Sequence, residues 1–326
     1  MKLADISQTY DPISPISDVR AKFQQNFDGL LKQIRGVVVI SPEKVKLALL
    51  GLFAQGHVLL EDLPGVGKTL LAKTIAGSID GKFSRIQFTP DLLPGDITGS
   101  SVFDSSKQTF SFLQGPIFAN IVIADELNRT GPRTQSALLE AMAEGAVSSD
   151  GEVWQFPKPF LIIATQNLIE TYGTFPLPNS QLDRFMISMQ LGLPTQEEEI
   201  EILRRAEQGT RKVKPLLSQG EIIEMQETAA NVQLAGSVRE YIANLATATR
   251  QSEDISVGVS PRGSTVLQRA CQAWAAFDGR SFVIPEDIQD LASYVWSHRI
   301  IVGVNQDTAS GRQAIKDLIR SVPVPL

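Results

Sequence analysis

The chain has 326 residues, of which 43% are hydrophobic, a length and composition that allow two globular domains. A single cysteine excludes an internal disulfide, and two histidines disfavour a metal site built by the protein alone. The longest apolar run, of about eight residues, is far shorter than the roughly 18 that span a bilayer. A net charge of −6 argues against a broad nucleic-acid-binding surface.

The N-terminal part of the chain is predicted to be an arm followed by two helices. Residues 1–20 are polar and interrupted by proline, so we expect a loosely held arm there. A helical pattern runs over about residues 21–33. A second helix begins after Ser41, which is followed by proline and glutamate in the first turn, and it ends near Gly56.

The most informative segment joins an apolar strand at residues 57–60 to a helix through a glycine-bearing turn. Backbone N–H groups and the positive end of a helix converge in such a turn, so a chain of phosphates is its natural ligand. Lys68 is expected to reach the outer phosphates, and the Thr69 hydroxyl to bind Mg²⁺. A surface turn is the alternative, which the flanking strand and helix disfavour. The predicted phosphate-binding residues are Pro64, Gly65, Val66, Gly67, Lys68, Thr69 and Leu70.

Two insertions interrupt the pattern of strands and helices. The first, residues 91–113, follows a strand at residues 84–88, carries two glycine turns and has a predicted hairpin around residues 104–107. The second, residues 145–156, is predicted to be a hairpin with Asp150-Gly151 at its tip, the pair preferred in two-residue turns. Both could be surface decoration; we favour a functional role.

Two carboxylates follow a short, wholly apolar run at residues 121–124, which is typical of a parallel strand buried on both faces. Asp125 is placed to hold a metal ion through its water shell, and Glu126 to orient and activate an attacking water. Asp125 lies 57 residues after Lys68 (125 − 68), which leaves room for a helix, a strand and a crossover. The alternative is a solvated acidic turn.

Three further polar side chains have candidate roles. Asn167 follows the apolar strand at residues 160–164, where its amide could hydrogen-bond the water or the γ-phosphate. Arg184 ends a short helical stretch before the strand at residues 186–191 and could face a neighbouring subunit. Arg262, in the first turns of a helix opened by serine and proline, could touch a phosphate. Each could instead be an ordinary turn or surface residue.

The order of elements predicts an α/β fold with a separate helical domain. Strands alternate with helical patterns up to residue 191, which indicates a parallel sheet covered by helices, with ligand at the carboxyl ends of the strands. No strand is predicted beyond that point. Capping boxes instead open helices at Thr195, Ser218 and Ser237. We therefore expect an N-terminal arm, a nucleotide-binding core and a helical lid domain at residues 1–20, 21–194 and 195–326.

The motifs together resemble those of the MoxR family of AAA+ ATPases over roughly residues 20–310. The stretch after Asp125 carries the most family-specific residues. The resemblance implies an AAA+ P-loop core with a parallel five-stranded sheet in the order 5-1-4-3-2. It also implies a helix-two insert, a pre-sensor-one hairpin and an all-α lid domain. The matching motifs read Pro-Gly-Val-Gly-Lys-Thr, Asp-Glu-Leu-Asn-Arg-Thr, Ala-Thr-Gln-Asn, Leu-Asp-Arg-Phe and Ser-Pro-Arg.

The resemblance also implies a role for each candidate residue. Asp62 replaces a glycine of the general P-loop pattern, but an acidic residue is usual there in this family. Residues 40–42 read Ile-Ser-Pro, where relatives commonly carry Gly-Gln beside the adenine. By the same carry-over the Walker A residues are Lys68 and Thr69, the Walker B pair is Asp125 and Glu126, sensor 1 is Asn167, the arginine finger is Arg184 and sensor 2 is Arg262.

The function implied by the resemblance is hydrolysis of Mg-ATP to ADP and phosphate by a chaperone ring that remodels, assembles or matures client proteins. A ring, expected to be hexameric, is the implied assembly, and a finger acting in trans would complete the positive charge around the phosphates only at a subunit boundary. The implied partners are a von Willebrand factor A-domain protein and an unidentified client. We expect a cytoplasmic location, no membrane span and no nucleic-acid partner. The alternatives are a metal-chelatase subunit, a DNA-handling ATPase and a nucleotide-switched scaffold.

Overall fold

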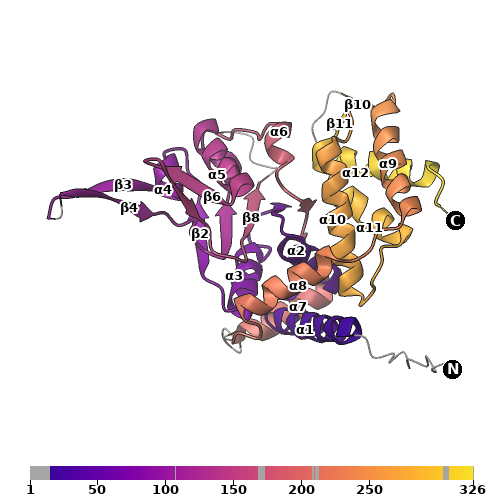
Figure 1. Ribbon diagram of the computed structural model, residues 1–326, viewed down its shortest axis with the longest axis horizontal. Helices are drawn as coiled ribbons and strands as arrows, with labels where there is room; N and C mark the ends of the chain where they lie inside the picture. Colours follow the sequence, from indigo (N-terminus) through magenta and orange to yellow (C-terminus); the bar gives the residue numbers. More distant parts are fainter. Residues whose placement is uncertain are drawn as a thin grey trace, which may run out of the picture.

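The computed structural model describes residues 15–106, 108–167, 173–207, 209, 213–303 and 308–325. Figure 1 shows a sheet-containing core on one side of the molecule and a group of helices from the C-terminal part of the chain on the other. The predicted plan, a parallel sheet followed by a helical domain, is confirmed. No helix among these described residues is long and apolar enough to cross a membrane.

Five parallel strands form the sheet of the core, in the order β2-β5-β8-β1-β9. Numbered along the chain within this sheet alone, the order is 2-3-4-1-5, which is 5-1-4-3-2 from the opposite edge. Alternate residues of the buried strands enter hydrophobic clusters on the two faces of the sheet. Because the strands are parallel, their carboxyl ends meet at one edge. The strands are β1 (Val58–Glu61), β2 (Phe83–Gln87), β5 (Ile121–Asp125), β8 (Leu161–Gln166) and β9 (Ile187–Met189).

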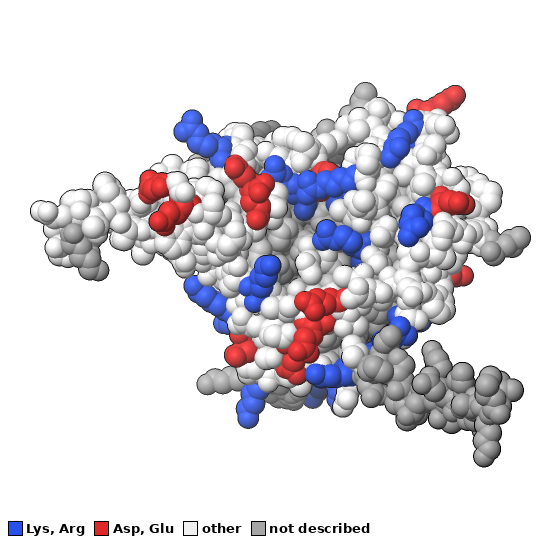
Figure 2. All heavy atoms as spheres, in the orientation of Figure 1, with Lys and Arg blue, Asp and Glu red and all other residues white. Residues whose placement is uncertain are grey.

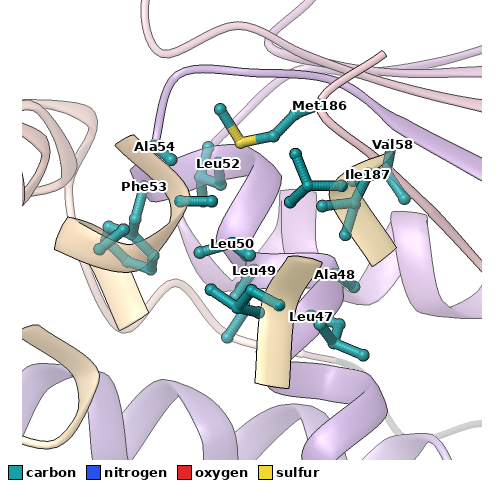
Figure 3. Packing of buried hydrophobic residues seen from close by; sticks show 14 of the residues in the cluster. Leu47, Ala48, Leu49, Leu50, Leu52, Phe53, Ala54, Val58, Met186 and Ile187 are labelled. Carbon is teal, nitrogen blue, oxygen red and sulfur yellow. The ribbon is translucent and has the colours of Figure 1, made fainter. Parts of the chain in front are cut away.

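Helix α2 (Pro42–Phe53) packs closely against this sheet. The Ser41 hydroxyl accepts a hydrogen bond from the Lys44 backbone N–H at 3.4 Å, which caps the helix as its sequence predicts. Figure 3 shows the leucines of α2 packed near β1 and β9. A Cβ atom on Gly51 would lie 2.5 Å from Val58 Cγ2, so only glycine allows this approach. The other helical segments of the core are α3 (Lys68–Ser78), α4 (Pro94–Thr98), η1 (Leu127–Arg129), α5 (Pro132–Glu144) and α6 (Asn179–Leu182).

Helix α1 (Pro15–Val37) begins six residues before the predicted start at residue 21, so the expected arm overlaps it. The pattern-based prediction was wrong here because proline, which suggested a loose arm, is also tolerated in the first turn of a helix. Residues 1–14 lie outside the described residues. The helix contacts core helices and lid helices alike, and the Phe27 ring stacks on Phe277 at a centroid distance of 4.0 Å.

Both predicted insertions contain antiparallel hairpins, and the β3–β4 hairpin projects from the body of the molecule (Figure 1). In the second hairpin Asp150 and Gly151 have φ values of 52° and 82°, the two left-handed positions that a type I′ turn requires. The Phe112 and Trp154 rings stack at 4.9 Å and join the hairpins. Lys107, in the predicted tip of the first, lies outside the described residues. The strands are β3 (Gly99–Asp104), β4 (Thr109–Gln114), β6 (Ala146–Ser149) and β7 (Glu152–Gln155).

The second half of the chain is helical, but the prediction that no strand follows residue 191 is wrong. Strands β10 (Ile255–Val257) and β11 (Ile301–Val302) form a small antiparallel sheet. Each strand is too short for an alternation of polar and apolar residues to be recognised in the sequence. The capping boxes at Thr195 and Ser218 are present, whereas the expected box at Ser237 is not, because that helix already begins at Gly236. The lid helices are α7 (Gln196–Glu207), α8 (Gln219–Ala230), α9 (Gly236–Gln251), α10 (Pro261–Phe277), α11 (Pro285–Trp296), η2 (Ser297–Arg299) and α12 (Thr308–Ser321).

Candidate functional site

The segment at residues 62–69, hereafter the phosphate loop, comprises the turn between β1 and α3 and the first two residues of α3. Gly65 and Gly67 have φ values of 85° and 95°, conformations that side-chain-bearing residues rarely adopt. Gly67 is the N-cap of α3, so the positive end of this helix faces the loop. The Lys68 amine donates to the carbonyl oxygens of Asp62 and Leu63, each at 3.2 Å. The loop is thus shaped for an anion, and its lysine is within reach of it.

A cavity of about 570 Å³ brings most of the predicted site residues together. Residues of the phosphate loop form one wall and the carboxyl ends of β5 and β8 form the other. A volume of this size is typical of a small-molecule site. The predicted residues that line the cavity are Pro64, Gly65, Gly67, Lys68, Thr69, Leu70, Asp125, Glu126 and Asn167, and Arg85 and Gln87 join them from β2.

Asp125, at the end of β5, has both carboxylate oxygens engaged. The Thr165 hydroxyl donates to Oδ1 at 2.8 Å, and the Arg85 guanidinium donates to Oδ2 at 2.7 Å. The Asp125 side chain is only 11% exposed. Because these partners hold the carboxylate in place, a metal ion bound nearby would contact it through water more readily than directly.

Glu126 has a left-handed backbone, with φ 59° and ψ 48°, which is uncommon for a residue other than glycine and costs on the order of 1 kcal/mol. Its N–H donates to the Thr165 hydroxyl at 2.8 Å, which fixes this conformation. Gln87 donates to the Glu126 carboxylate at 2.7 Å, and Arg129 forms an ion pair with it at 3.3 Å. The carboxylate therefore lies on the cavity wall under restraint from two neighbouring side chains.

The remaining predicted polar residues divide into one that lines the cavity and two that do not. Asn167 lines it, is 6% exposed, and its backbone carbonyl accepts from the Asn128 amide at 3.2 Å. Arg184 donates to the Leu139 carbonyl of α5. Arg262, with its side chain 52% exposed, lies 3.7 Å from the Asp183 carboxylate. The two arginines are thus near α6 and the lid, outside the cavity wall.

A second cavity, of about 550 Å³, adjoins the first and shares Gly65, Gly67 and Leu70 with it. Its wall is mostly apolar, which suits a flat heterocyclic base. The segment at residues 36–40 forms one side, and the chain between β9 and α7 forms the other. Sequence reasoning singled out Ile40 but did not identify this wall, whose members include Val38, Val39, Ile40, Lys44, Val66, Leu191, Gly192, Leu193 and Ile202.

Sequence reasoning also missed a buried arginine that joins the lid to α6. The Arg299 side chain is 2% exposed, and its guanidinium donates to the Asp183 carboxylate at 2.8 Å. Burial lowers the pKa of Arg299 to about 10, while the Asp183 charge opposes that shift. Arg262 approaches the other oxygen of the same carboxylate. Residue 299 follows an apolar helix, and no sequence signal distinguishes it from a surface arginine.

Mg²⁺ fits the donors that this cavity offers. Thr69 and Asp125, a hydroxyl and a carboxylate, line the same cavity from its two walls. Within the described part of the chain, no three or more His, Cys, Asp or Glu side chains gather to hold a metal ion. A metal ion here would therefore share its remaining positions between phosphate and water, as Mg²⁺ does in nucleotide sites.

Charge on the molecular surface is mixed. Figure 2 shows acidic and basic side chains interspersed on one face, with several basic ones between the core and the lid. The chain as a whole carries a net charge of −6. This face therefore lacks the broad basic surface that binding along a nucleic acid requires.

Comparisons with known proteins agree on the class of the chain. A model of the ATPase family associated with various cellular activities matches residues 57–187, and a model of the AAA lid domain matches residues 247–318. The uncharacterised protein YeaC of Bacillus subtilis is 43% identical over 93% of this chain and 98% of that protein. Chaperone MoxR1 of Mycobacterium tuberculosis is 38% identical over 90% of this chain and 81% of that protein. A crystal structure of a candidate ATPase from Cytophaga hutchinsonii has a TM-score of 0.87 and 35% identity, covering 95% of this chain and 98% of that one.

Proposed function

Because this chain belongs to the MoxR family of AAA+ ATPases, we propose that it binds Mg-ATP in the two joined cavities and hydrolyses it to ADP and phosphate. We propose further that it works as a ring, expected to be hexameric, that remodels, assembles or matures client proteins. The observation that carries the enzymatic proposal is the 570 Å³ cavity. It places the phosphate loop, two carboxylates and an amide around one space.

Each residue of the cavity has a proposed role in binding the triphosphate. The backbone N–H groups of the phosphate loop and the Lys68 amine hold the phosphates. Thr69 would bind Mg²⁺ directly, and Asp125 would hold its water shell. The chemistry supplied by a metal ion held there would be neutralisation of charge on the phosphate oxygens. The base occupies the second cavity, between residues 36–40 and the segment before α7.

Glu126 is the proposed base for the attacking water. A carboxylate in this position can orient the water and accept its proton. In this structure Gln87 and Arg129 both contact Oε2 of that carboxylate, so Oε1 is the oxygen that would accept the proton of the water. Asn167, on the neighbouring strand, would hydrogen-bond the water or the γ-phosphate.

The two arginines outside the cavity are proposed to add to the positive charge that Lys68 and Mg²⁺ would place around the triphosphate. We assign Arg184 as a finger that serves the nucleotide of the adjacent subunit, and Arg262 as a lid residue that reads the γ-phosphate. An arginine supplied in trans contributes about 10³–10⁵ in rate in related phosphoryl transfers. Arg184 would first leave the Leu139 carbonyl, and Arg262 the Asp183 carboxylate. An isolated subunit should therefore be nearly inactive.

Client contact is proposed for the two hairpins, which we assign as the helix-two insert (β3–β4) and the pre-sensor-one hairpin (β6–β7). Large apolar side chains are exposed on β3 and β4, with Phe110 at 71% and Leu113 at 66%. Exposed apolar surface on a projecting element suits contact with another protein. A von Willebrand factor A-domain protein and an unidentified client remain the proposed partners.

Steady-state hydrolysis of Mg-ATP, measured over a range of protein concentrations, tests this function. Glu126→Gln should bind ATP as the natural protein does but hydrolyse it about 10²–10⁴-fold more slowly, because the base is lost. The exposed Glu144→Gln on α5 is its matched control and should be fully active. Absence of hydrolysis in the natural protein, or equal rates in Glu126→Gln, would refute the enzymatic proposal. The same variant, used as an ATP-bound trap, can then capture the client.

A further inference from the structure

The carboxylate of Asp62 joins the phosphate loop to the chain that leaves the sheet. Asp62 is the first residue after β1 and is only 7% exposed. Its Oδ2 accepts the Leu191 backbone N–H at 2.6 Å, and its Oδ1 accepts the Gly192 backbone N–H at 2.9 Å. A buried carboxylate that accepts two backbone N–H groups makes charge-assisted hydrogen bonds and holds its partners firmly.

The partners of Asp62 belong to the crossing segment, residues 190–194, which connects β9 in the core to α7. The Lys44 amine donates to the Leu191 carbonyl, so side chains hold both the backbone C=O and the backbone N–H of Leu191. Gly192 has a φ of 69°, which allows its N–H to face the carboxylate. Leu191, Gly192 and the two residues that follow also line the 550 Å³ cavity. The position of the crossing segment therefore sets both that wall and the start of α7.

Asp62 is also hydrogen-bonded to Lys68 of the phosphate loop. The Lys68 amine donates to the backbone carbonyl of Asp62 at 3.2 Å. Asp62 thus contacts Lys68 through its main chain and the crossing segment through its side chain. A glycine at this position, as in the general P-loop pattern, could make only the first of these contacts.

We propose that Asp62 is a positioning residue that transmits phosphate occupancy of the loop to the crossing segment and α7. This inference rests on the proposed nucleotide binding. When Lys68 turns toward a phosphate it leaves the Asp62 carbonyl, and the peptide that carries the carboxylate is released. The carboxylate moves with it and carries the Leu191 and Gly192 N–H groups, so the crossing segment and α7 change position.

Asp62→Asn tests this step because an amide has one acceptor oxygen where the carboxylate has two. One of the two N–H groups of the crossing segment would then face an NH₂ group instead of an acceptor. Lys68 and the rest of the phosphate loop stay intact, so phosphate binding should persist while its effect on residues 190–207 is lost. Glu61→Gln is the matched control, because Glu61 is a buried neighbour whose carboxylate contacts Ser188 and Thr308 instead.

The measurement is hydrogen–deuterium exchange of the amides in residues 190–207, with and without saturating Mg-ATP, next to ATP binding by the same samples. In the natural protein and in Glu61→Gln, ATP should change exchange there by about 5-fold or more, the range of a typical coupling between two sites. In Asp62→Asn the change should fall below about 2-fold although ATP is still bound. A merely structural role would lower exchange protection in Asp62→Asn both with and without ATP, but would leave its ATP-dependent change in place.

If Asp62→Asn does not fold, Asp62→Gly replaces it, because glycine keeps the backbone carbonyl that Lys68 contacts but has no side chain to accept the N–H groups of the crossing segment. It should lose the ATP-dependent change in the same way. A change in either variant equal to that of the natural protein would overturn the role of Asp62. Failure of the natural protein to bind ATP would refute the proposed function itself, and the inference with it.

Discussion

At the scale of single residues, the hydrogen bonds of His57 fix its protonation state. Its Nδ1 accepts the Ile162 backbone N–H at 3.1 Å, and its Nε2 lies 3.2 Å from the Met142 carbonyl. Nδ1 must keep its lone pair and Nε2 its proton, so the ring is neutral. Burial is the main cause that lowers the pKa of His57 to about 4. The imidazole is thus a structural link between β8 and α5.

Stability should therefore fall as the pH is lowered from about 6.5 to 4. In this window the unfolded chain binds a proton at His57 that the folded protein does not, so protonation favours unfolding. The cost at His57 is about 2 kcal/mol between pH 7 and pH 5. Burial also lowers the pKa of His298, which adds a loss of the same sign. Urea unfolding at the two pH values measures the sum.

His57→Gln isolates the contribution of His57, because glutamine offers a donor and an acceptor but does not titrate. The variant should lose about 2 kcal/mol less stability than the natural protein between pH 7 and pH 5. An unchanged pH dependence would show that His57 is not the group responsible.

Sequence reasoning singled out the cavity-lining residues that belong to a continuous motif and missed those that another strand contributes. Lys68 and Thr69 are neighbours in the chain, and a turn between strand and helix is enough to propose a phosphate ligand. Arg85 and Gln87 lie in the cavity only because β2 pairs with β5 in a register that sets Gln87 beside Asp125. Nothing in the local sequence gives that register.

At the scale of elements, α1 is one of the parts of the chain that tie the core to the lid. Its Phe27 is fully buried, stacks on Phe277 of α10 and lies edge-on to Phe53 of α2 at 6.0 Å. The three rings come from an N-terminal helix, a core helix and a lid helix. This cluster should therefore couple the stability of the two halves.

Phe27→Ala should lower the free energy of unfolding by about 3–5 kcal/mol, the usual cost of emptying a buried aromatic site. Probes in the core and in the lid should report the same lowered midpoint in chemical denaturation. Phe282→Ala, with the ring 53% exposed, is the control and should change stability by about 0.5 kcal/mol or less. A loss seen by lid probes alone would contradict the coupling role of α1.

Elements with strong local signals were predictable, and those that depend on tertiary context were not. The Asp150-Gly151 hairpin follows from turn chemistry, and the buried strands β5 and β8 follow from their apolar runs. Strands β10 and β11 have three and two residues, and they exist because the lid brings the two segments together. The early start of α1 was hidden by proline.

At the scale of the whole molecule, the arrangement of arginines argues for assembly. Arg184 and Arg262 do not line the 570 Å³ cavity of their own chain, although the other predicted polar residues do. Arg184 follows α6 in the chain, and its side chain donates to the Leu139 backbone carbonyl of α5. An adjacent subunit that reaches this face would place its nucleotide near Arg184, which is the basis of the ring proposal.

Mixing two inactive variants tests action across a subunit boundary. Arg184→Ala should bind ATP but not hydrolyse it, and Lys68→Ala should not bind ATP, because the phosphate charge loses its cation. A mixture should recover part of the activity, since Arg184→Ala supplies intact phosphate loops and Lys68→Ala supplies intact fingers. The exposed Lys73→Ala on α3 controls for loss of charge alone. No recovery at any ratio would count against a finger in trans.

The most direct test of the central claim is the structure of Glu126→Gln crystallised with Mg-ATP. We expect the triphosphate in the 570 Å³ cavity, the base in the adjoining 550 Å³ cavity, and the Lys68 amine moved from the carbonyls of Asp62 and Leu63 to a phosphate oxygen. ATP bound elsewhere, or a phosphate loop without ligand at saturating ATP and with Lys68 still on those carbonyls, would contradict the account.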